Sequence, residues 1–263
     1  MHSIEASNLA VAYDDHLIVP NLDLCLPQGK ITSIIGPNGC GKSTVLKAVG
    51  RLLKPRGGMV YLNGRDIKQM STREIAKKMA VLPQTPQAPG GLTVNELVSF
   101  GRFPHQKGFG RLSEEDKKTV RWALEATRLT GYETTPVDNL SGGQRQRVWI
   151  AMALAQQTDL ILLDEPTTYL DLSYQLEVLE LLQRLNSEQG CTIVMVLHDL
   201  NLAARFSHYM VAVRNGEMVF SGTPEEVMQH EVLKKTFSID AEIVMDPRTG
   251  KPACITYNLI NEA

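Results

Sequence analysis

The chain has 263 residues, and its 27 Lys and Arg residues against 29 Asp and Glu residues leave a formal net charge of −2. This balance argues against a basic nucleic-acid-binding arm and against an acidic tail, and 43% hydrophobic residues suffice for a sizeable core. Because no run of 18 apolar residues is present and the first residues lack a signal-peptide pattern, we expect no membrane span and a cytoplasmic location. The four cysteines fit neither a zinc site nor a disulfide framework, so we expect reduced thiols.

Strand patterns dominate the beginning of the chain. The alternation of apolar and polar residues over 4–11 and 22–27 predicts an antiparallel strand layer. The β-rich run 31–35 stops at a Gly-Pro-Asn-Gly turn, and residues 43–53 then have helical spacing. A hairpin is predicted at 59–64, where a short strand meets Asn-Gly. The order strand, glycine loop, helix is the feature that matters for function.

The middle of the chain is predicted to be mainly helical. A short strand at 79–82 precedes a loop at 85–91 with two prolines and two glycines. Helices are predicted over 93–100 and 113–128, the second opening on Ser and Asp in capping-box spacing, and a third over 142–157. These helices predict a subdomain inserted into the surrounding α/β pattern.

Alternating strands and helices return in the last third. An apolar strand at 160–163, a helix at 173–185 and a strand at 192–197 predict parallel pairing. Thr-Pro-Glu-Glu at 223–226 is typical of a helix start, and Asp-Pro-Arg-Thr-Gly at 246–250 predicts a hairpin. The fold class is therefore α/β.

A phosphate-binding loop is the strongest motif. The segment GPNGCGKST fits G-x-x-x-x-G-K-[ST] and lies between a predicted strand and a predicted helix. The alternative interpretation, without a function, is a glycine-rich turn with an incidental lysine. In such a loop the backbone amides face the phosphates, the lysine reaches the β and γ phosphates and the serine hydroxyl can bind Mg²⁺. The candidate nucleotide-binding residues are Gly36, Pro37, Asn38, Gly39, Cys40, Gly41, Lys42, Ser43 and Thr44.

Two carboxylates end the apolar strand at 160–163. Asp164 is placed to hold Mg²⁺, and Glu165 is placed to polarise the water that attacks the γ phosphate; the alternative is a solvated acid at a strand end. A second anion-binding turn is predicted where the helix at 142–157 begins, because Ser141 is a natural N-cap and two glycines leave the amides accessible. The residues of this turn are Ser141, Gly142, Gly143 and Gln144.

Together, in this order and spacing, the phosphate loop, the Leu-Ser-Gly-Gly-Gln turn and the Asp-Glu strand resemble the ATPase subunit of ABC transporters. The resemblance covers essentially the whole chain. It implies a P-loop NTPase (RecA-like) core with an antiparallel β subdomain and an inserted α-helical subdomain. The implied division is a nucleotide-binding core with the β layer at 1–85 and 158–220, a helical subdomain carrying the signature turn at 86–157, and a short C-terminal segment at 221–263.

The resemblance also assigns roles to single residues. Gln84 resembles the family's glutamine loop, which senses Mg²⁺ and water, and His198 resembles the switch histidine that contacts the γ phosphate. Asp171, in Tyr169-Leu170-Asp171, falls where the family's D-loop lies, and Tyr13 resembles the aromatic that stacks on adenine. The alternative, purely structural roles are strand-end caps for Gln84 and His198, a turn aspartate for Asp171, and a core strand tyrosine for Tyr13.

The resemblance further implies cofactors and partners. In the family, ATP with Mg²⁺ is held between the phosphate loop of one subunit and the signature turn of the other in a head-to-tail dimer. It implies a second ATP-binding subunit (a homodimer), separate transmembrane permease subunits, a substrate-binding protein acting indirectly, no nucleic acid, and a peripheral position on the cytoplasmic side of the membrane.

Residues 91–98 and Gly101-Arg102-Phe103-Pro104 resemble the iron-complex branch of importer ATPases, and within it those of ferric-siderophore importers. The implied function is ATP hydrolysis that drives uptake of ferric siderophores. An importer ATPase for cobalamin or haem is the alternative. A DNA-repair ATPase would need a coiled-coil insertion or zinc-binding cysteine pairs, and a ribosome-associated member would carry two such domains.

Overall fold

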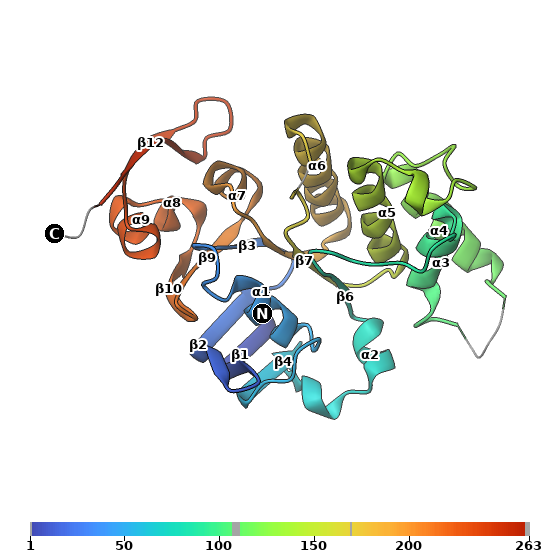
Figure 1. Ribbon diagram of the computed structural model, residues 1–263, viewed down its shortest axis with the longest axis horizontal. Coiled ribbons are helices and arrows are strands. Elements are labelled where there is room, and N and C mark those ends of the chain that lie inside the picture. Colours follow the sequence, from blue (N-terminus) through green and yellow to red (C-terminus); the bar gives the residue numbers. More distant parts are fainter. Residues whose placement is uncertain (1, 107–110, 169, 261–263) are drawn as a thin grey trace. The chain divides into compact units, whose positions relative to one another are not determined.

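The computed structural model describes residues 2–106, 111–168 and 170–260 (Figure 1). These residues form two compact units, residues 1–69 with 192–263 (unit 1) and residues 70–191 (unit 2). The division predicted from the sequence, into a core, a helical subdomain and a C-terminal segment, remains a prediction. Within the described residues, no helix is long and apolar enough to cross a membrane.

Unit 1 begins with an antiparallel sheet in the order β2-β1-β4-β5, of which β1, β2 and β4 are labelled in Figure 1. Its strands are β1 (His2–Tyr13), β2 (His16–Pro27), β4 (Gly57–Leu62) and β5 (Arg65–Asp66). Leu9, Val11 and Val19 are fully buried while their chain neighbours face outward, which is the period-two pattern of a strand with one covered face. Leu62 pairs with Arg65 across the predicted Asn-Gly turn. The predicted antiparallel layer and this hairpin are confirmed.

A second group of strands in unit 1 is parallel at its centre. The strands are β3 (Ile31–Ile35), β8 (Thr192–Val196), β9 (Tyr209–Arg214) and β10 (Glu217–Gly222). β3 pairs in parallel with both β8 and β9, and β10 pairs antiparallel with β9. Every residue of β3 and β8 is buried, as expected for strands covered on both faces. Helix α1 (Lys42–Val49) follows β3 after the glycine loop.

The C-terminal part of unit 1 combines helices and a hairpin. Its elements are α7 (Leu200–Phe206), α8 (Pro224–Val227), α9 (His230–Phe237), β11 (Ile239–Met245) and β12 (Pro252–Leu259). Strands β11 and β12 pair around the predicted turn, which confirms the hairpin. Asn201 on α7 holds β12 through two hydrogen bonds, since its side chain donates to the Cys254 carbonyl (3.0 Å) and accepts from the Cys254 amide (2.8 Å).

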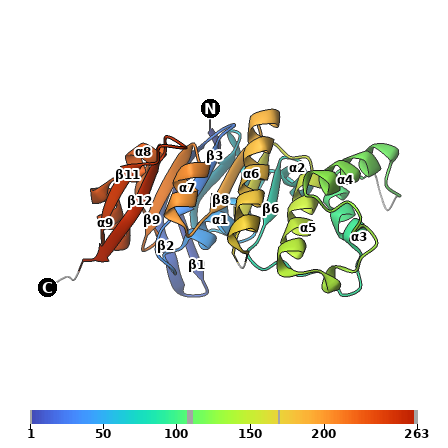
Figure 2. The ribbon, with the colours of Figure 1, turned by 90° about the horizontal axis from the view of Figure 1, so that it is seen from above.

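Unit 2 contains two parallel strands and most of the helices. Its elements are α2 (Thr72–Ala76), β6 (Met79–Leu82), α3 (Val94–Ser99), η2 (Phe100–Arg102), α4 (Glu114–Ala126), η3 (Val137–Asn139), α5 (Gly142–Ala155), β7 (Leu160–Asp164) and α6 (Leu172–Gln189). β6 and β7 pair in parallel from Met79 with Leu160 to Leu82 with Leu163. Helices α3, α4 and α5 pack together (Figure 2), and α4 begins with the predicted capping box of Ser113 and Asp116.

A buried ion pair anchors the C-terminal end of α5. Arg102 is only 5% exposed, and its Nε lies 2.8 Å from Asp116 Oδ1. The same guanidinium donates to the Ala155 carbonyl (2.7 Å) and to the Gln157 side chain (2.9 Å). Burial alone would raise the pKa of Asp116, but hydrogen bonds from Ser113 and Arg102 lower it overall. The guanidinium therefore ties α4 to the last turn of α5.

Two predicted helix ends differ from the structure. α1 ends at Val49, not at Leu53, because Gly50 closes it and Arg51 adopts a left-handed backbone (φ 58°). α6 runs to Gln189 instead of stopping at Leu185, and ends where Gly190 adopts a left-handed conformation (φ 66°). The elements α2, α7, α9, β9 and β10 were not predicted.

Candidate nucleotide site

The phosphate loop lies between β3 and α1, as predicted, and its glycines serve different purposes. Gly39 (φ 75°) and Gly41 (φ 103°) adopt backbone angles that residues with a Cβ rarely accept. At Gly36 the constraint is space, because a Cβ there would lie 2.1 Å from the Val213 carbonyl oxygen. The loop can take this path only with glycine at these positions, which leaves its amides free of covering side chains.

Lys42 is buried within the phosphate loop. Its side chain is folded back so that Nζ donates to the carbonyl oxygens of Gly36 (2.9 Å) and Pro37 (2.8 Å), and the residue is 4% exposed. The ammonium is therefore held over the loop that begins its own helix, where the helix N-terminus also favours negative charge. Ser43 and Thr44 follow on the first turn of α1. This arrangement suits a phosphate group.

The cysteines differ in exposure, and the one in the phosphate loop is protected. Cys40, in the loop, is buried, and burial raises the pKa of its thiol although the Lys42 charge opposes the shift. Cys191 is also buried, Cys254 is partly exposed and Cys25 on β2 is exposed. A neutral thiol is a poor nucleophile, so Cys40 acts as a small residue of the loop.

The end of β7 carries the two predicted carboxylates. Asp164 is its last residue and is buried, and Glu165 follows with 9% exposure and a left-handed backbone (φ 54°). Such a backbone is costly for a residue with a side chain and concentrates at functional sites. Gln84 Nε2 donates to Glu165 Oε2 (2.6 Å), and the Thr168 hydroxyl donates to the same oxygen (3.0 Å). The structure thus brings Gln84 and Glu165 together.

The donor chemistry of the predicted metal ligands fits Mg²⁺. Asp164 offers carboxylate oxygens, Ser43 a hydroxyl and Gln84 an amide oxygen, since its nitrogen donates to Glu165. Mg²⁺ prefers oxygen ligands, often one or two carboxylates together with substrate phosphates. In the described ranges, no group of three His, Cys, Asp or Glu residues gathers to hold a metal. The chemistry of each of these donors therefore suits a cation that arrives with a phosphate ligand.

The signature turn opens α5 and is exposed. Ser141 is the N-cap, its hydroxyl accepting from the Gln144 amide (3.3 Å) while the Gln144 side chain accepts from the Ser141 amide (3.0 Å). Apart from its chain neighbours and the backbone of its own helix, no described residue has an atom within 4 Å of where a Cβ on Gly142 would lie. Gly143 packs instead against Tyr174 and Leu170, whose side-chain atoms lie 3.5 and 3.6 Å from its Cβ position.

The remaining predicted residues lie at element ends. Asp171 is the N-cap of α6 and accepts from the Tyr174 amide (3.0 Å), but Tyr169 is outside the described residues. His198 follows β8, is exposed, and lines a cavity of about 470 Å³ with α7, α9 and the C-terminal hairpin. Tyr13, at the end of β1, is 44% exposed, so its alternative as a core tyrosine is wrong.

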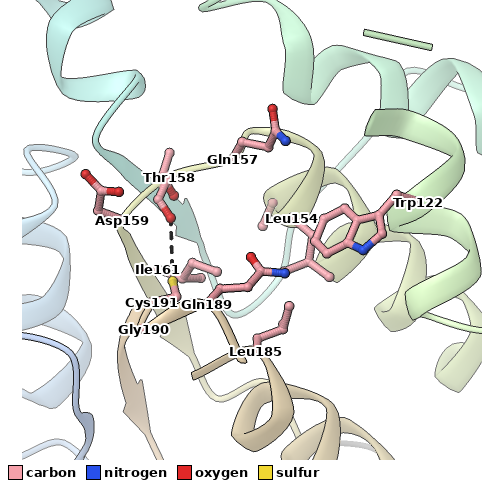
Figure 3. Close-up of a pocket in the computed structure, with 11 residues that line it drawn as sticks. Trp122, Leu154, Gln157, Thr158, Asp159, Ile161, Leu185, Gln189, Gly190 and Cys191 are labelled. Carbon is pink, nitrogen blue, oxygen red and sulfur yellow. Dashed lines mark hydrogen bonds between the residues drawn. The ribbon is translucent and has the colours of Figure 1, made fainter. Parts of the chain in front are cut away.

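A separate cavity in unit 2 contains none of the predicted residues. It measures about 440 Å³ and lies between the ends of α5 and α6, with Trp122, Asp159 and Cys191 among its lining residues (Figure 3). Burial, and then the Asp159 charge, raise the pKa of Cys191 to about 12, and its thiol donates to the Thr158 carbonyl (3.5 Å). This thiol is a structural donor and not a reactive group.

Three side chains beside the predicted residues were missed from the sequence. Thr168 holds Glu165, Gln146 on α5 donates to the Pro166 carbonyl (3.1 Å), and Arg147 stacks over the Tyr174 ring. The spacing of Thr168 three residues after Glu165 is a turn signal that could have found it. Gln146 and Arg147 carry no local signal, because only the fold brings α5 beside the segment after β7.

Comparisons with known proteins agree with this geometry. The family model described as "ABC transporter" matches residues 19–168. The iron(3+)-hydroxamate import ATP-binding protein FhuC of Bacillus subtilis (strain 168) is 62% identical over 260 residues, 99% of this chain and 97% of that protein.

Solved structures are similar over most of the chain. An inward-facing ABC transporter described as being of metal-chelate type has a TM-score of 0.81 and 27% identity, and the match covers 97% of this chain and 96% of that one. A dimeric ATP-binding cassette in a post-hydrolysis state, bound to ADP and Pi, has a TM-score of 0.74 and 32% identity, covering 84% of this chain and 98% of that one.

Proposed function

Because the chain belongs to the ABC transporter family of ATPases, we propose that it is the motor subunit that drives import of ferric hydroxamate siderophores through separate membrane subunits. The observation that carries the cargo is the 62% identity to a hydroxamate import ATPase over nearly the full length of both chains. The cargo does not touch this subunit in the family, so it is assigned by kinship and not by a pocket.

The proposed chemistry starts from the phosphate loop. The amides of Gly39 and Gly41 and the Lys42 ammonium bind the β and γ phosphates, and Tyr13, exposed at the end of β1, stacks on the adenine. Ser43 and Asp164, with Gln84, would hold Mg²⁺, which when bound neutralises charge that develops on the phosphates. These assignments rest on donor chemistry and on the placement of each residue.

Glu165 is proposed to orient and deprotonate the attacking water. Its Oε2 accepts from Gln84 and Thr168, which fixes the carboxylate while its second oxygen accepts a proton. His198 is proposed to donate to the γ phosphate and Asp171 to shape the turn beside the signature residues. The exposed Ser141 turn is proposed to complete the site of a second copy, and the dimeric similar structure supports this arrangement.

The partners follow from the same proposal. A chain whose described residues contain no helix long and apolar enough to span a membrane is proposed to act through permease subunits when it drives import. We therefore place the chain at the cytoplasmic face of the membrane, as a homodimer that contacts the permease. A substrate-binding protein acts on this homodimer only indirectly, through the permease.

The decisive experiment is uptake of radiolabelled ferric hydroxamate in cells whose single copy of this protein carries Glu165→Gln. We expect ATP to stay bound, because the phosphate loop is intact, and uptake to fall to background, because the water is no longer activated. Glu188→Gln, an exposed position on α6, is the matched control and should keep full uptake.

Unchanged uptake in the Glu165→Gln cells would contradict the proposal. Labelled cobalamin and haem would then be tested in the same cells, and loss of either would reassign the cargo while keeping the motor role. Rapid ATP hydrolysis by the purified Glu165→Gln chain would instead contradict the role of Glu165.

A further inference from the structure

Four side chains meet where the signature helix α5 lies beside α6, the helix that Asp171 caps. They are Arg128, which follows the end of α4, Arg147 on α5, and Tyr174 and Glu177 on the first two turns of α6. We call them the Arg147 cluster. All four belong to unit 2. None of them is part of the nucleotide-binding residues named above.

Arg147 is the centre of the cluster. Its guanidinium carbon lies 4.9 Å from the centroid of the Tyr174 ring, which is cation–π geometry. Its Nη1 lies 3.7 Å from Glu177 Oε2, and its side chain is 14% exposed. Arg128 reaches the other oxygen of Glu177 at 3.0 Å from a largely solvent-exposed side. Arg147 therefore makes the buried link and Arg128 the exposed one.

Tyr174 contacts both turns of interest. Its ring lies against Gly143, the second glycine of the signature turn, at 3.5 Å from the Cβ position. Its backbone amide donates to Asp171, and Leu170, just before Asp171, packs on Gly143 as well. A movement of the Gly143 backbone must therefore be passed to the Asp171 turn, because packed atoms cannot interpenetrate.

A second contact reaches the Glu165 loop from the same helix face. Gln146, next to Arg147, donates to the carbonyl of Pro166, the residue after Glu165. The first two turns of α5 therefore touch the Asp171 turn through Tyr174 and the Glu165 loop through Gln146. The signature turn and two proposed catalytic elements of the same chain are joined by direct contacts.

One hydrogen-bond donor of Arg147 has no acceptor among the described residues. Its Nε is buried and has no hydrogen-bond partner among the residues that the structure describes. A buried donor without an acceptor is costly, and such groups call for an explanation. The missing acceptor is explained if the cluster shifts and gives the Arg147 Nε an acceptor in another state of the protein. A residue that couples two sites requires such a second arrangement.

We propose that Arg147 is a positioning residue that couples the two ATP sites of the dimer. The proposal rests on the proposed function, in which the signature turn of one copy binds the nucleotide held by the other. When that nucleotide binds at Gly142 and Gly143, the Tyr174 ring and Arg147 shift with the turn, and they set the Asp171 turn and the Glu165 loop that serve the chain's own nucleotide. Hydrolysis at the two sites is then cooperative.

The test is the ATP dependence of hydrolysis by the purified full-length chain. The Hill coefficient is measured for the wild type, Arg147→Lys and Tyr174→Leu, with Tyr174→Phe and Arg128→Ala as matched controls. Arg147→Lys keeps the charge but loses the planar group that stacks on the ring, and Tyr174→Phe keeps the ring that Tyr174→Leu removes. Thermal unfolding of each variant checks folding, and binding of a fluorescent ATP analogue checks the phosphate loop.

We expect a Hill coefficient of about 2 for the wild type and both controls, the limit for two sites, and of about 1 for Arg147→Lys and Tyr174→Leu with analogue binding unchanged. If one of these variants does not fold, the other decides the outcome. A wild-type coefficient of 1, equal coefficients in all variants, or an equal loss in Arg128→Ala would overturn the proposal. Because no iron complex enters this assay, its result does not depend on the cargo assignment.

Discussion

The phosphate loop and the signature turn are both helix N-termini built to face an anion, but they are held in different ways. In the phosphate loop Asn38 and Gly39 are exposed, but Lys42 is buried and donates to the loop's own carbonyls, and Gly36 is pressed against the Val213 backbone. The signature turn is exposed, and its first glycine has open space around it among the described residues. The first is complete within its unit, and the second presents a surface.

This difference shows where each motif gets its precision. The phosphate loop is shaped from within by the hydrogen bonds of Lys42 and by the close contact at Gly36, so its geometry is already set before a ligand arrives. The signature turn is positioned from behind, through Arg102 at the far end of α5 and through Tyr174 at its near end. Substitutions should therefore damage the phosphate loop directly, and the signature turn mainly through its supports.

The largest expected effect on stability comes from removing Arg102, which anchors the C-terminal end of α5. Arg102→Met leaves the Asp116 carboxylate buried without its partner, and breaking a buried ion pair in this way costs about 3–5 kcal/mol of unfolding free energy. Urea denaturation of the purified chain measures this loss. The double variant Arg102→Met, Asp116→Leu should recover part of it, and an unchanged midpoint in the single variant would show that the anchor is unimportant.

Gly36→Ala should have the next largest effect. The new methyl group would overlap the Val213 carbonyl, and at φ 155° the backbone disfavours a side chain, so we expect a loss of about 3 kcal/mol and weak ATP binding. Gly142→Ala is the matched control, because its methyl group enters open space. Equal losses of stability in the two variants would remove the contrast between the two motifs.

Ser141→Ala should have the smallest effect. It removes an N-cap hydroxyl, which costs about 1 kcal/mol, and it leaves the phosphate loop untouched. Nucleotide binding by the single chain should therefore equal that of the wild type in a titration, while ATP-dependent dimerisation weakens. A loss of nucleotide affinity in the single chain would mean that the signature turn is not a separate surface.

Most strands and most helices could be predicted from the sequence because their signals are local. The N-cap residues Thr93, Ser113 and Ser141 all begin helices where predicted. The hairpin of β9 and β10 was missed although Asn215-Gly216 is a two-residue turn signal, and both residues adopt the positive φ that such a turn requires. α6 was predicted to end too early at Leu185, although no stop signal occurs in the sequence before Gly190, which ends the helix.

The site was predicted as a set of residues but not as a set of contacts. Gln84 and Glu165 each follow a strand, and parallel pairing of β6 with β7 puts their side chains within hydrogen-bond distance. Arg145 and Arg147 look equivalent in the sequence. Only the packing of α5 on α6 distinguishes them, since Arg147 lies on the Tyr174 ring while Arg145 donates to the Leu140 carbonyl.

The unequal exposure of the four thiols offers a practical route to optical studies. Cys25 lies on the outer side of β2, whereas Cys40 and Cys191 are enclosed. A maleimide dye used briefly should therefore label Cys25 first, and replacing Cys254 with serine would make this position the single reactive one. The wild-type loop cysteine could then stay in place, so that a fluorescent chain reports on nucleotide binding without any substitution in the phosphate loop.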